Sequence, residues 1–386
     1  MLPFQRFLVQ EKRRPYDKLQ PTENRNLPVT CIPHLPQVVL QTAVSCGFHL
    51  SGIAPVLESE ADGAVDDRPG SRAVPELAYF PGWLAEGRAG EMEYLKRRDG
   101  DGRLLRSSVR IPFPWARSVI VCAVNYNCDQ PYSIDPAQEG TGWIARYAWS
   151  GTSQIAGTDN SPDQRLNPTD YHSVVRERLE QLRGKLQREL GSFDARCFVD
   201  TGPLVERVYA KYAGLGWQGK NTCLIHESLG SWLFLGVILT SLELSPTDWA
   251  QPLADRCGSC TRCIDACPTD ALEPYRMDAS RCIAYLTIEK RGTIPEELAA
   301  KTGRNVFGCD ICQEVCPWNN KGGSRPPVTD WPELQPRKEL INPALDWLAS
   351  LREEGFRLRF RHSPVERSKY AGWERNVAIA SKNSAE

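Results

Sequence analysis

The chain has 386 residues, and its 47 lysines and arginines against 48 aspartates and glutamates give it a net charge of −1. This length allows about two or three domains, and the balanced charge excludes a basic field over the whole surface, so any nucleic-acid contact must be local. No apolar run approaches the roughly 18 residues of a membrane span, and residues 1–26 lack the apolar core of a signal peptide. We therefore expect a cytoplasmic protein that does not bind a membrane.

The first part of the sequence predicts an α/β domain over residues 31–248, preceded by a flexible arm at 1–30. A helical pattern begins near Pro36 and leads into a short apolar stretch at 49–56. The segment 57–75 is acidic and contains a Pro-Gly pair, which indicates a loop.

The next elements alternate between helices and apolar strands, which favours an α/β sheet. Residues 83–95 predict two short helices around a glycine turn, and the apolar run at 118–124 predicts a strand buried on both faces. Residues 150–169 are polar and rich in turn formers, so a loop is expected. A helix follows, capped by Thr169 or Asp170. Its apolar stripe consists of Val175, Leu179, Leu182, Leu186 and Leu190.

Asp200 follows a short predicted strand at 196–199 and precedes a helix predicted to begin at 201–203. Open α/β sheets bind ligands at this end of their strands, so Asp200 is a candidate site residue. The alternative is an aspartate that only caps the helix or forms the turn. Glu206 and Arg207, one turn later, could be a solvated pair. A further apolar run, at 232–240, predicts another strand.

The glycine-rich segment 214–221 resembles two nucleotide-binding motifs but matches neither. As G-x-G-x-x-G it follows a helix, where a dinucleotide-binding fold requires a strand. As G-x-x-x-x-G-K it has Asn221 where a P-loop has Ser or Thr. What remains is a turn in which glycines let the backbone approach another group closely, or a helix end packed under Trp217.

Two cysteine runs organise residues 249–325. The first, at 257–268, reads C-x2-C-x2-C-x3-C-P; the second, at 309–317, reads C-x2-C-x3-C-P, and a lone Cys282 lies between them. Bacterial ferredoxins hold 4Fe-4S clusters with this spacing, and the fourth cysteine of a run binds the other cluster. A zinc site uses cysteine pairs, and a disulfide framework belongs to secreted proteins.

We therefore predict a ferredoxin-like domain with two 4Fe-4S clusters. One cluster is assigned to Cys257, Cys260, Cys263 and Cys316, and the other to Cys267, Cys282, Cys309 and Cys312. The remaining cysteines are scattered singly, as reduced core residues often are. They are Cys31, Cys46, Cys122, Cys128, Cys197 and Cys223.

Several segments together resemble the epoxyqueuosine reductase family, in family order from about residue 36 to 377. They are 87–95, Arg106, 145–149 (A-R-Y-A-W), 170–172 (D-Y-H), 200–207 (D-T-G-P-L-V-E-R), 214–222 (G-L-G-W-Q-G-K-N-T), 282–288 (C-I-A-Y-L-T-I) and the two cysteine runs. The resemblance implies a cobalamin-dependent oxidoreductase that reduces epoxyqueuosine to queuosine at the wobble position of tRNA, the last step of queuosine biosynthesis.

The resemblance also implies an architecture and a set of site residues. It implies an α/β cobalamin-binding domain, then the ferredoxin-like domain, then a short helical, HEAT-like segment at 326–386. Asp200 matches the proton donor of the family. The segments that line the corrinoid contain Arg106, Ala145, Asp200, Leu224, Leu235, Leu286 and Thr287. No histidine ligand to cobalt is expected, because the D-x-H-x-x-G pattern is absent.

The chain departs from the family pattern in its loops. Residues 152–169 separate the R-Y-A-W and D-Y-H segments, which the family usually joins directly, and both the arm at 1–26 and the loop at 57–75 are longer than usual. These differences concern loop positions and not the residues implied in the chemistry.

The predicted partners are the anticodon loop of tRNA and an external low-potential electron donor, and we expect a monomer. Residues 356–376 interleave six Arg or Lys with Phe356, Phe360, Tyr370 and Trp373. This pattern suits phosphate contacts and base stacking, or simply an amphipathic helix. The basic residues are Arg357, Arg359, Arg361, Arg367, Lys369 and Arg375.

Another corrinoid iron–sulfur reductase, such as a reductive dehalogenase, is the alternative function; a simple electron carrier would leave the α/β domain unexplained.

Overall fold

A computed structural model describes residues 35–59, 71–151, 170–244, 251–320 and 323–385. Apart from Leu35, these residues belong to one compact unit that runs from Pro36 to Glu386. The predicted arm at 1–30 and most of the predicted loop at 150–169 lie outside the described residues. Within the described residues, no helix is both long and apolar enough to cross a bilayer.

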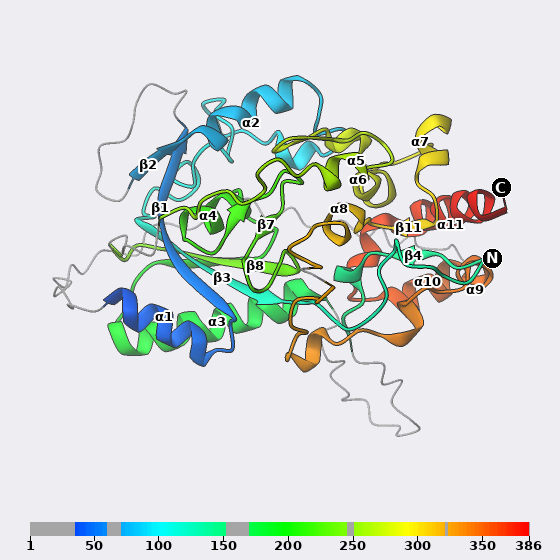
Figure 1. The fold of residues 1–386 in the computed structure, drawn as a ribbon. Helices are drawn as coiled ribbons and strands as arrows, with labels where there is room; N and C mark the ends of the chain where they lie inside the picture. Colours follow the sequence, from blue (N-terminus) through cyan, green and yellow to red (C-terminus); the bar gives the residue numbers. More distant parts are fainter. Residues whose placement is uncertain (1–34, 60–70, 152–169, 245–250, 321–322, 386) are drawn as a thin grey trace, which may run out of the picture. The chain divides into compact units, whose positions relative to one another are not determined.

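A five-stranded sheet, with strand order β2-β1-β3-β8-β5, forms the centre of the α/β part (Figure 1). Its strands are β1 (Leu50–Ser59), β2 (Ser71–Val74), β3 (Ser118–Asn125), β5 (Ala195–Phe198) and β8 (Leu233–Thr240). Only β1 and β2 pair in parallel, and the other neighbours are antiparallel. β3 is buried along its whole length, as its apolar run predicts.

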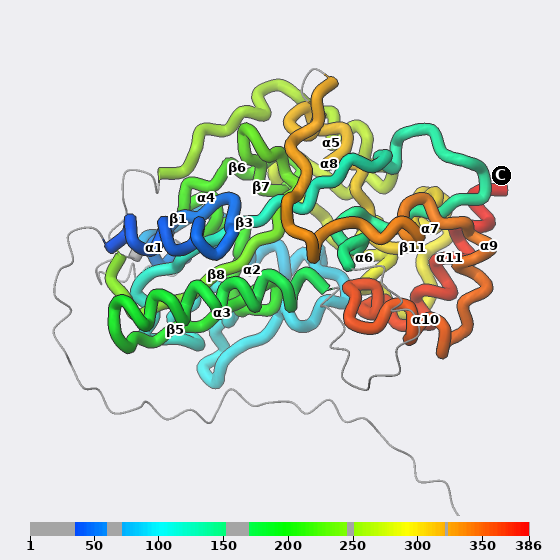
Figure 2. Tube along the Cα trace, turned by 90° about the horizontal axis from the view of Figure 1, so that it is seen from below, coloured from blue at the N-terminus to red at the C-terminus, as the bar shows by residue number. Residues whose placement is uncertain are grey.

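Helices cover both faces of this sheet, which explains why its central strands are apolar throughout. α1 (Leu35–Ser45) and α3 (Tyr171–Leu190) lie side by side on one face (Figure 2). α2 (Pro75–Ala85) and α4 (Glu206–Tyr212) lie on the other. Asp170 caps α3 by accepting the His172 N–H, and the predicted stripe of α3 is buried from Val175 to Leu186.

Two predictions of local structure are wrong. The loop expected at 57–75 contains the end of β1 and all of β2, and α2 begins at its last residue, Pro75. The helix expected to begin at 201–203 begins instead at Glu206. The backbone of Asp200 is left-handed, with φ of +54°. The next five residues are not helical, and α4 begins only after them.

The two cysteine runs lie in a region of short elements. Its helices are α5 (Arg262–Asp265), α6 (Ile283–Ile288), α7 (Glu296–Lys301) and α8 (Ile311–Glu314), and its strands are β9 (Leu272–Glu273), β10 (Arg276–Met277) and β11 (Asn305–Phe307). α5 and α8 each contain one cysteine of a run. β11 pairs in parallel with β4 (Trp143–Ile144), which joins this region to the segment that precedes α3.

The C-terminal helices are α9 (Leu345–Ser350), α10 (Glu353–Phe360) and α11 (Lys369–Ala385). They pack with β4 and β11 around a second core that contains Phe356, Phe360 and Trp373. These three rings are buried, so the prediction that they stack on bases is wrong. Tyr370 retains an accessible surface.

Asn376 on α11 ties the C-terminal segment to the cysteine region. Its buried side-chain amide donates to the carbonyl oxygens of Thr287, at 2.7 Å, and Val306, at 2.9 Å. Asn383, about two helical turns further on, donates to Ala299 and Gly303, each at 3.0 Å, from a half-exposed position.

Asn376→Ala should therefore lower the free energy of unfolding by about 1–3 kcal/mol, because it leaves buried carbonyl groups without donors. Asn383→Ala should cost less than half as much, since water can replace its amide. Anaerobic thermal unfolding of both variants measures the difference. Equal losses would show that the buried amide has no special role in holding α11.

Candidate cofactor and active site

Four cysteines from both runs surround one cavity of about 260 Å³. We call Cys257, Cys260, Cys263 and Cys316 the surface cysteine group, because their neighbours Gly258, Ser259, Thr261 and Arg262 are exposed. A zinc ion would draw its thiolates to within roughly 4 Å of one another. Among the described residues, however, no three His, Cys, Asp or Glu side chains lie close enough together to hold a single metal ion. Room between four sulfurs suits a multi-iron cluster.

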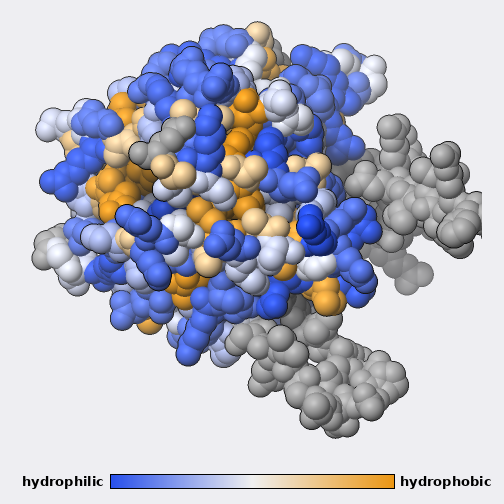
Figure 3. Space-filling model, turned by 90° about the vertical axis from the view of Figure 1, so that its right-hand side faces the viewer, coloured by the Kyte–Doolittle hydropathy of each residue, from blue (hydrophilic) through white to orange (hydrophobic). Residues whose placement is uncertain are grey.

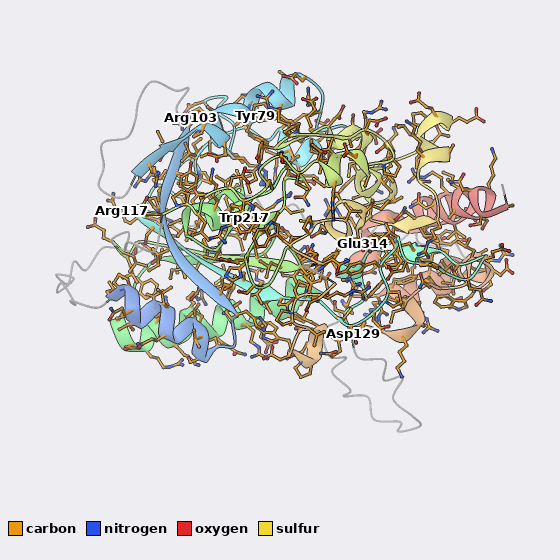
Figure 4. The ribbon with its side chains drawn as sticks, in the orientation of Figure 1. Tyr79, Arg103, Arg117, Asp129, Trp217 and Glu314 are labelled. Carbon is orange, nitrogen blue, oxygen red and sulfur yellow. The ribbon has the colours of Figure 1, made fainter. Side chains whose placement is uncertain are left out.

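The indole of Trp217 gives a second test of this site. Trp217 is buried, packs with Cys257 and Cys316, and lies in the interior near α4 (Figure 4). Its Nε1–H has no hydrogen-bond partner among the described residues. Such a donor costs about 1–3 kcal/mol when it is left unmet, and the sulfur atoms of a cluster would supply an acceptor. The residues present therefore fit a 4Fe-4S cluster.

The interior cysteine group consists of Cys267, Cys282, Cys309 and Cys312. Cys282 interacts electrostatically with Cys267, and Cys309 interacts with Cys282. Burial raises the pKa of Cys282 and raises that of Cys309 well above its usual value. A metal bound by these thiols would have to displace their protons.

The glycine-rich segment 214–221 leads into a tight hairpin of β6 (Trp217–Gln218) and β7 (Leu224–Ile225). A Cβ at Gly216 would lie 2.3 Å from the Ile225 carbonyl oxygen, so only glycine fits there. The hairpin turn holds both cysteine runs. Lys220 Nζ donates to the carbonyls of Gly258, at 2.6 Å, and Cys260, at 3.0 Å. The tight packing at Gly216 confirms the prediction of a close backbone approach.

Cys223, on the same turn, is not an isolated core residue, and that prediction is wrong. It is only partly buried, and the neighbouring Cys312 side chain lowers its pKa. Asn221 Nδ2 donates to the carbonyl oxygen of Cys312 at 3.1 Å. Nothing in the sequence indicates this proximity, because Cys223 lies outside both cysteine runs.

A second cavity, of about 1370 Å³, extends from α2 past Asp200 to Cys223 and Gln313. Small-molecule sites usually measure roughly 300–1,000 Å³, so this cavity has room for an unusually large ligand. Four of the seven predicted cofactor contacts line it, namely Arg106, Asp200, Leu224 and Leu235.

Two of the other three predicted contacts, Ala145 and Thr287, lie beside Gly308, which precedes Cys309. The hydroxyl of Thr287 accepts the Gly308 N–H at 2.9 Å. A Cβ at Gly308 would lie 2.5 Å from the Cβ of Ala145. Leu286 packs in a small core with Ile294 and Leu298. The structure therefore places Ala145, Leu286 and Thr287 close to the interior cysteine group and not among the described lining of the cavity.

Asp200 is held from two sides at the cavity wall. Its Oδ2 accepts a hydrogen bond from the Tyr171 hydroxyl at 2.5 Å, and its backbone N–H donates to Glu206 Oε1 at 2.8 Å. The residue that precedes α4 is Val205, so Asp200 does not cap this helix. The alternative of a helix cap is wrong.

Glu206 is buried, so it is not half of a solvated pair with Arg207. Burial raises the pKa of Glu206 well above its usual value, and the nearby Asp200 carboxyl raises it further. Its Oε2 has no hydrogen-bond partner in the described part of the chain. A second carboxyl, whose charged form is disfavoured by burial, therefore lies next to Asp200.

Arg106 and three aromatic rings complete this wall of the cavity. Arg106 Nη1 donates to the carbonyl oxygen of Gly202 at 2.6 Å, so it restrains the loop that carries Asp200. The ring of Tyr171 stacks on Phe234, with centroids 4.0 Å apart, and Tyr126 stacks on Phe234 at 4.2 Å. The continuous apolar run at 232–240 predicts burial of Phe234 and does not indicate its place in the cavity.

Comparisons with known proteins agree with this arrangement. A family model described as "Epoxyqueuosine reductase QueG, DUF1730" matches residues 106–201, and a model of a 4Fe-4S double cluster binding domain matches 256–319. An epoxyqueuosine reductase of Xanthomonas campestris is 40% identical over 80% of this chain and 79% of its own length. The chain belongs to the epoxyqueuosine reductase family.

Two further members of the family extend the comparison. The epoxyqueuosine reductase of Synechocystis is 37% identical over 84% of this chain and 98% of its own length. A crystal structure of an epoxyqueuosine reductase with a tRNA-Tyr epoxyqueuosine-modified stem loop superposes with a TM-score of 0.71 and 26% identity, covering 91% of this chain and 82% of that one. These matches confirm the family resemblance and favour it over the reductive dehalogenase alternative.

All eight predicted cluster ligands fall within the double-cluster match at 256–319. We therefore expect about eight iron atoms per chain after anaerobic purification. Cys282→Ser should retain about four, because only the interior group loses a ligand. Iron analysis and electron paramagnetic resonance check both values.

Cys197→Ser, which removes a buried thiol on β5, is the matched control and should keep all the iron. Four irons in the unaltered protein, or stoichiometric zinc, would contradict the two-cluster assignment.

Proposed function

We propose that this chain reduces epoxyqueuosine to queuosine at the wobble position of tRNA, with bound cobalamin and electrons from two 4Fe-4S clusters. The observation that carries the proposal is Asp200 at the wall of a 1370 Å³ cavity that reaches Cys223, beside the interior cysteine group. Membership of the epoxyqueuosine reductase family supports the reaction, and the stem-loop complex of a relative supports an RNA substrate.

The cavity residues fit a corrinoid in size and chemistry. A stacked wall of Tyr126, Phe234 and Tyr171 offers a flat apolar surface to a macrocycle. Among the described residues that line the cavity there is no histidine, so the proposal includes no histidine ligand to cobalt. The seven implied contacts divide into the four that line the cavity, the two beside Gly308, and Leu286, which packs near Cys282. Cobalamin, when bound, supplies the two-electron chemistry, and the clusters supply single electrons.

Removal of the epoxide oxygen as water takes up two electrons and two protons and leaves a carbon–carbon double bond. Asp200 is the proposed donor of a proton to the departing oxygen. The Tyr171 hydroxyl occupies Oδ2, so the transferable proton belongs on Oδ1. Arg106 and Glu206 hold the loop so that this carboxyl stays at the cavity wall.

We propose domain boundaries at 31–248, 249–325 and 326–386 within this framework, and a monomer as the active unit. The hairpin turn and the β4–β11 pairing join the first two parts closely. The surface cysteine group has exposed neighbours, so we propose that the external low-potential donor delivers electrons there.

Contact with tRNA involves fewer tail residues than the sequence suggests. Arg375 donates to the carbonyls of Leu286, at 2.7 Å, and Gly292, at 2.6 Å, so it holds the end of α6. Three basic residues are exposed: Arg357 on α10, Arg361 directly after it and Lys369 at the start of α11. The side of the molecule that carries these helices is largely hydrophilic, with scattered apolar patches (Figure 3). We propose that these three residues contact phosphates.

Replacing Arg357, Arg361 and Lys369 together with alanine should weaken binding of epoxyqueuosine-containing tRNA and flatten its dependence on salt, because fewer counterions are released. Filter binding at several salt concentrations measures both. Arg375→Ala is the contrasting variant and should lower stability first. Unchanged affinity and salt slope in the triple variant would remove α10 from the RNA surface.

Asp200→Asn keeps the shape and the contacts with Tyr171 and Glu206, and it removes the transferable proton. Single turnover on epoxyqueuosine-containing tRNA should fall roughly 10²–10⁴-fold. Binding of cobalamin and tRNA should stay near that of the unaltered protein, and so should reduction of the cofactor. Near-normal product formation with intact binding would exclude Asp200 as the proton donor.

A further inference from the structure

Lys220, in the turn between β6 and β7, lines the same cavity as the surface cysteine group. Its ammonium nitrogen donates to the carbonyl of Gly258, at 2.6 Å, and to that of Cys260, at 3.0 Å. Both carbonyls belong to the segment 257–260, which joins the first two cysteines of the group. A positive charge is therefore fixed against the loop that surrounds the cluster site.

Two cations line this cavity among the described residues, and they differ in their partners. Arg256 pairs with Glu227 at 2.6 Å, so its charge is largely compensated. Lys220 has no carboxylate partner in the described part of the chain, and its two acceptors are uncharged carbonyls. Asp255 lies beyond ion-pair distance of Lys220 and accepts the Cys257 N–H at 2.8 Å. Lys220 thus brings to the cavity wall a positive charge that no ion pair cancels.

This charge acts on a bound cluster through its electric field. A 4Fe-4S cluster held by four thiolates is negative, and reduction adds a further negative charge. A nearby cation therefore stabilises the reduced state more than the oxidised state, which raises the reduction potential. Because Lys220 is only partly buried, solvent and salt weaken this attraction without removing it.

We propose that Lys220 is a positioning residue of the surface cluster, the cluster held by the surface cysteine group, and that its charge raises the reduction potential of this cluster. The inference rests on the two-cluster part of the proposed function. It makes the surface cluster a better acceptor for electrons from an external donor. It also gives a role to a lysine that the sequence left unexplained, since the P-loop that would use it is absent.

The test is a redox titration of the full, cluster-loaded chain, followed by electron paramagnetic resonance. Lys220→Gln keeps an amide donor for the loop and removes the charge. The ratio of reduced to oxidised surface cluster at a fixed potential should then fall about tenfold, which corresponds to about 59 mV for a one-electron couple. Lys220→Arg keeps the charge and should stay near the unaltered protein. The signal that persists in Cys282→Ser identifies the surface cluster.

Ionic strength separates the effect of the charge from a change in the loop. The difference between Lys220→Gln and the unaltered protein should shrink as salt is raised from about 0.01 M to about 1 M, because the Debye length falls from roughly 30 Å to roughly 3 Å. A difference caused by a rearranged loop would not respond to salt in this way. Asp255 is present in every variant, so the comparison isolates the ammonium group.

The matched control is Lys185→Gln. Lys185 lies on α3 and likewise donates to a backbone carbonyl, that of Ser45, at 3.2 Å. Its replacement removes the same charge away from both cysteine groups and should leave both potentials unchanged. The Lys220 and Lys185 variants should all keep about eight irons.

An unchanged potential in Lys220→Gln, equal shifts in the Gln and Arg variants, or a shift that salt does not reduce would overturn the proposal. Loss of about four irons in Lys220→Gln would also overturn it, because Lys220 would then serve only to hold the loop. These measurements need neither cobalamin nor tRNA. If the unaltered protein fails to reduce epoxyqueuosine while the potential shift is present, the proposed function fails and the role of Lys220 stands.

Discussion

The hydrogen bonds that the hairpin turn donates to the cysteine runs are the contacts on which the site depends. The region at 251–320 consists of helices and strands of two to six residues, too short to bury much apolar surface alone. Lys220 and Asn221 hold its two runs against the sheet. On the other side, the buried carboxylate of Asp310 accepts the Arg146 N–H at 2.7 Å and the Trp143 indole N–H at 3.1 Å. Polar contacts from the α/β part therefore position sulfurs that the local chain could not position alone.

The sequence predicts the parts of this structure that depend on local pattern. The apolar runs of β3 and β8 and the apolar stripe of α3 are visible in the sequence itself, and these residues are buried in the structure as the patterns predict. The cysteine spacing likewise reports a ligand geometry. Spacing cannot show which distant groups meet, so the proximity of Cys223 to Cys312 was missed. The aromatic rings of α10 and α11 show the same limit, since their core exists only after β4 and β11 pair.

The loop that begins at Asp200 was misjudged for a different reason. Its residues could continue a helix from Thr201, but the left-handed turn at Asp200 delays the helix to Glu206. Such a conformation costs a non-glycine residue of order 1–3 kcal/mol. The buried carboxyl of Glu206, whose Oε2 has no partner among the described residues, adds to that cost. Tyr171, Arg106 and Glu206 offset it with specific hydrogen bonds. Stability is given up here to hold one carboxyl at the cavity wall.

Burial of the aromatic tail residues also constrains how RNA is recognised. With Phe356, Phe360 and Trp373 in the core, the surface of α10 offers mainly charges. Arginine contacts with phosphates set the position of a nucleic acid but carry no sequence information. Within the proposed function, selection of the modified base therefore falls to the large cavity, where Asp200 lies at the wall. In the proposed function, the charges of α10 attract tRNA without selecting it, and the selection is left to the cavity.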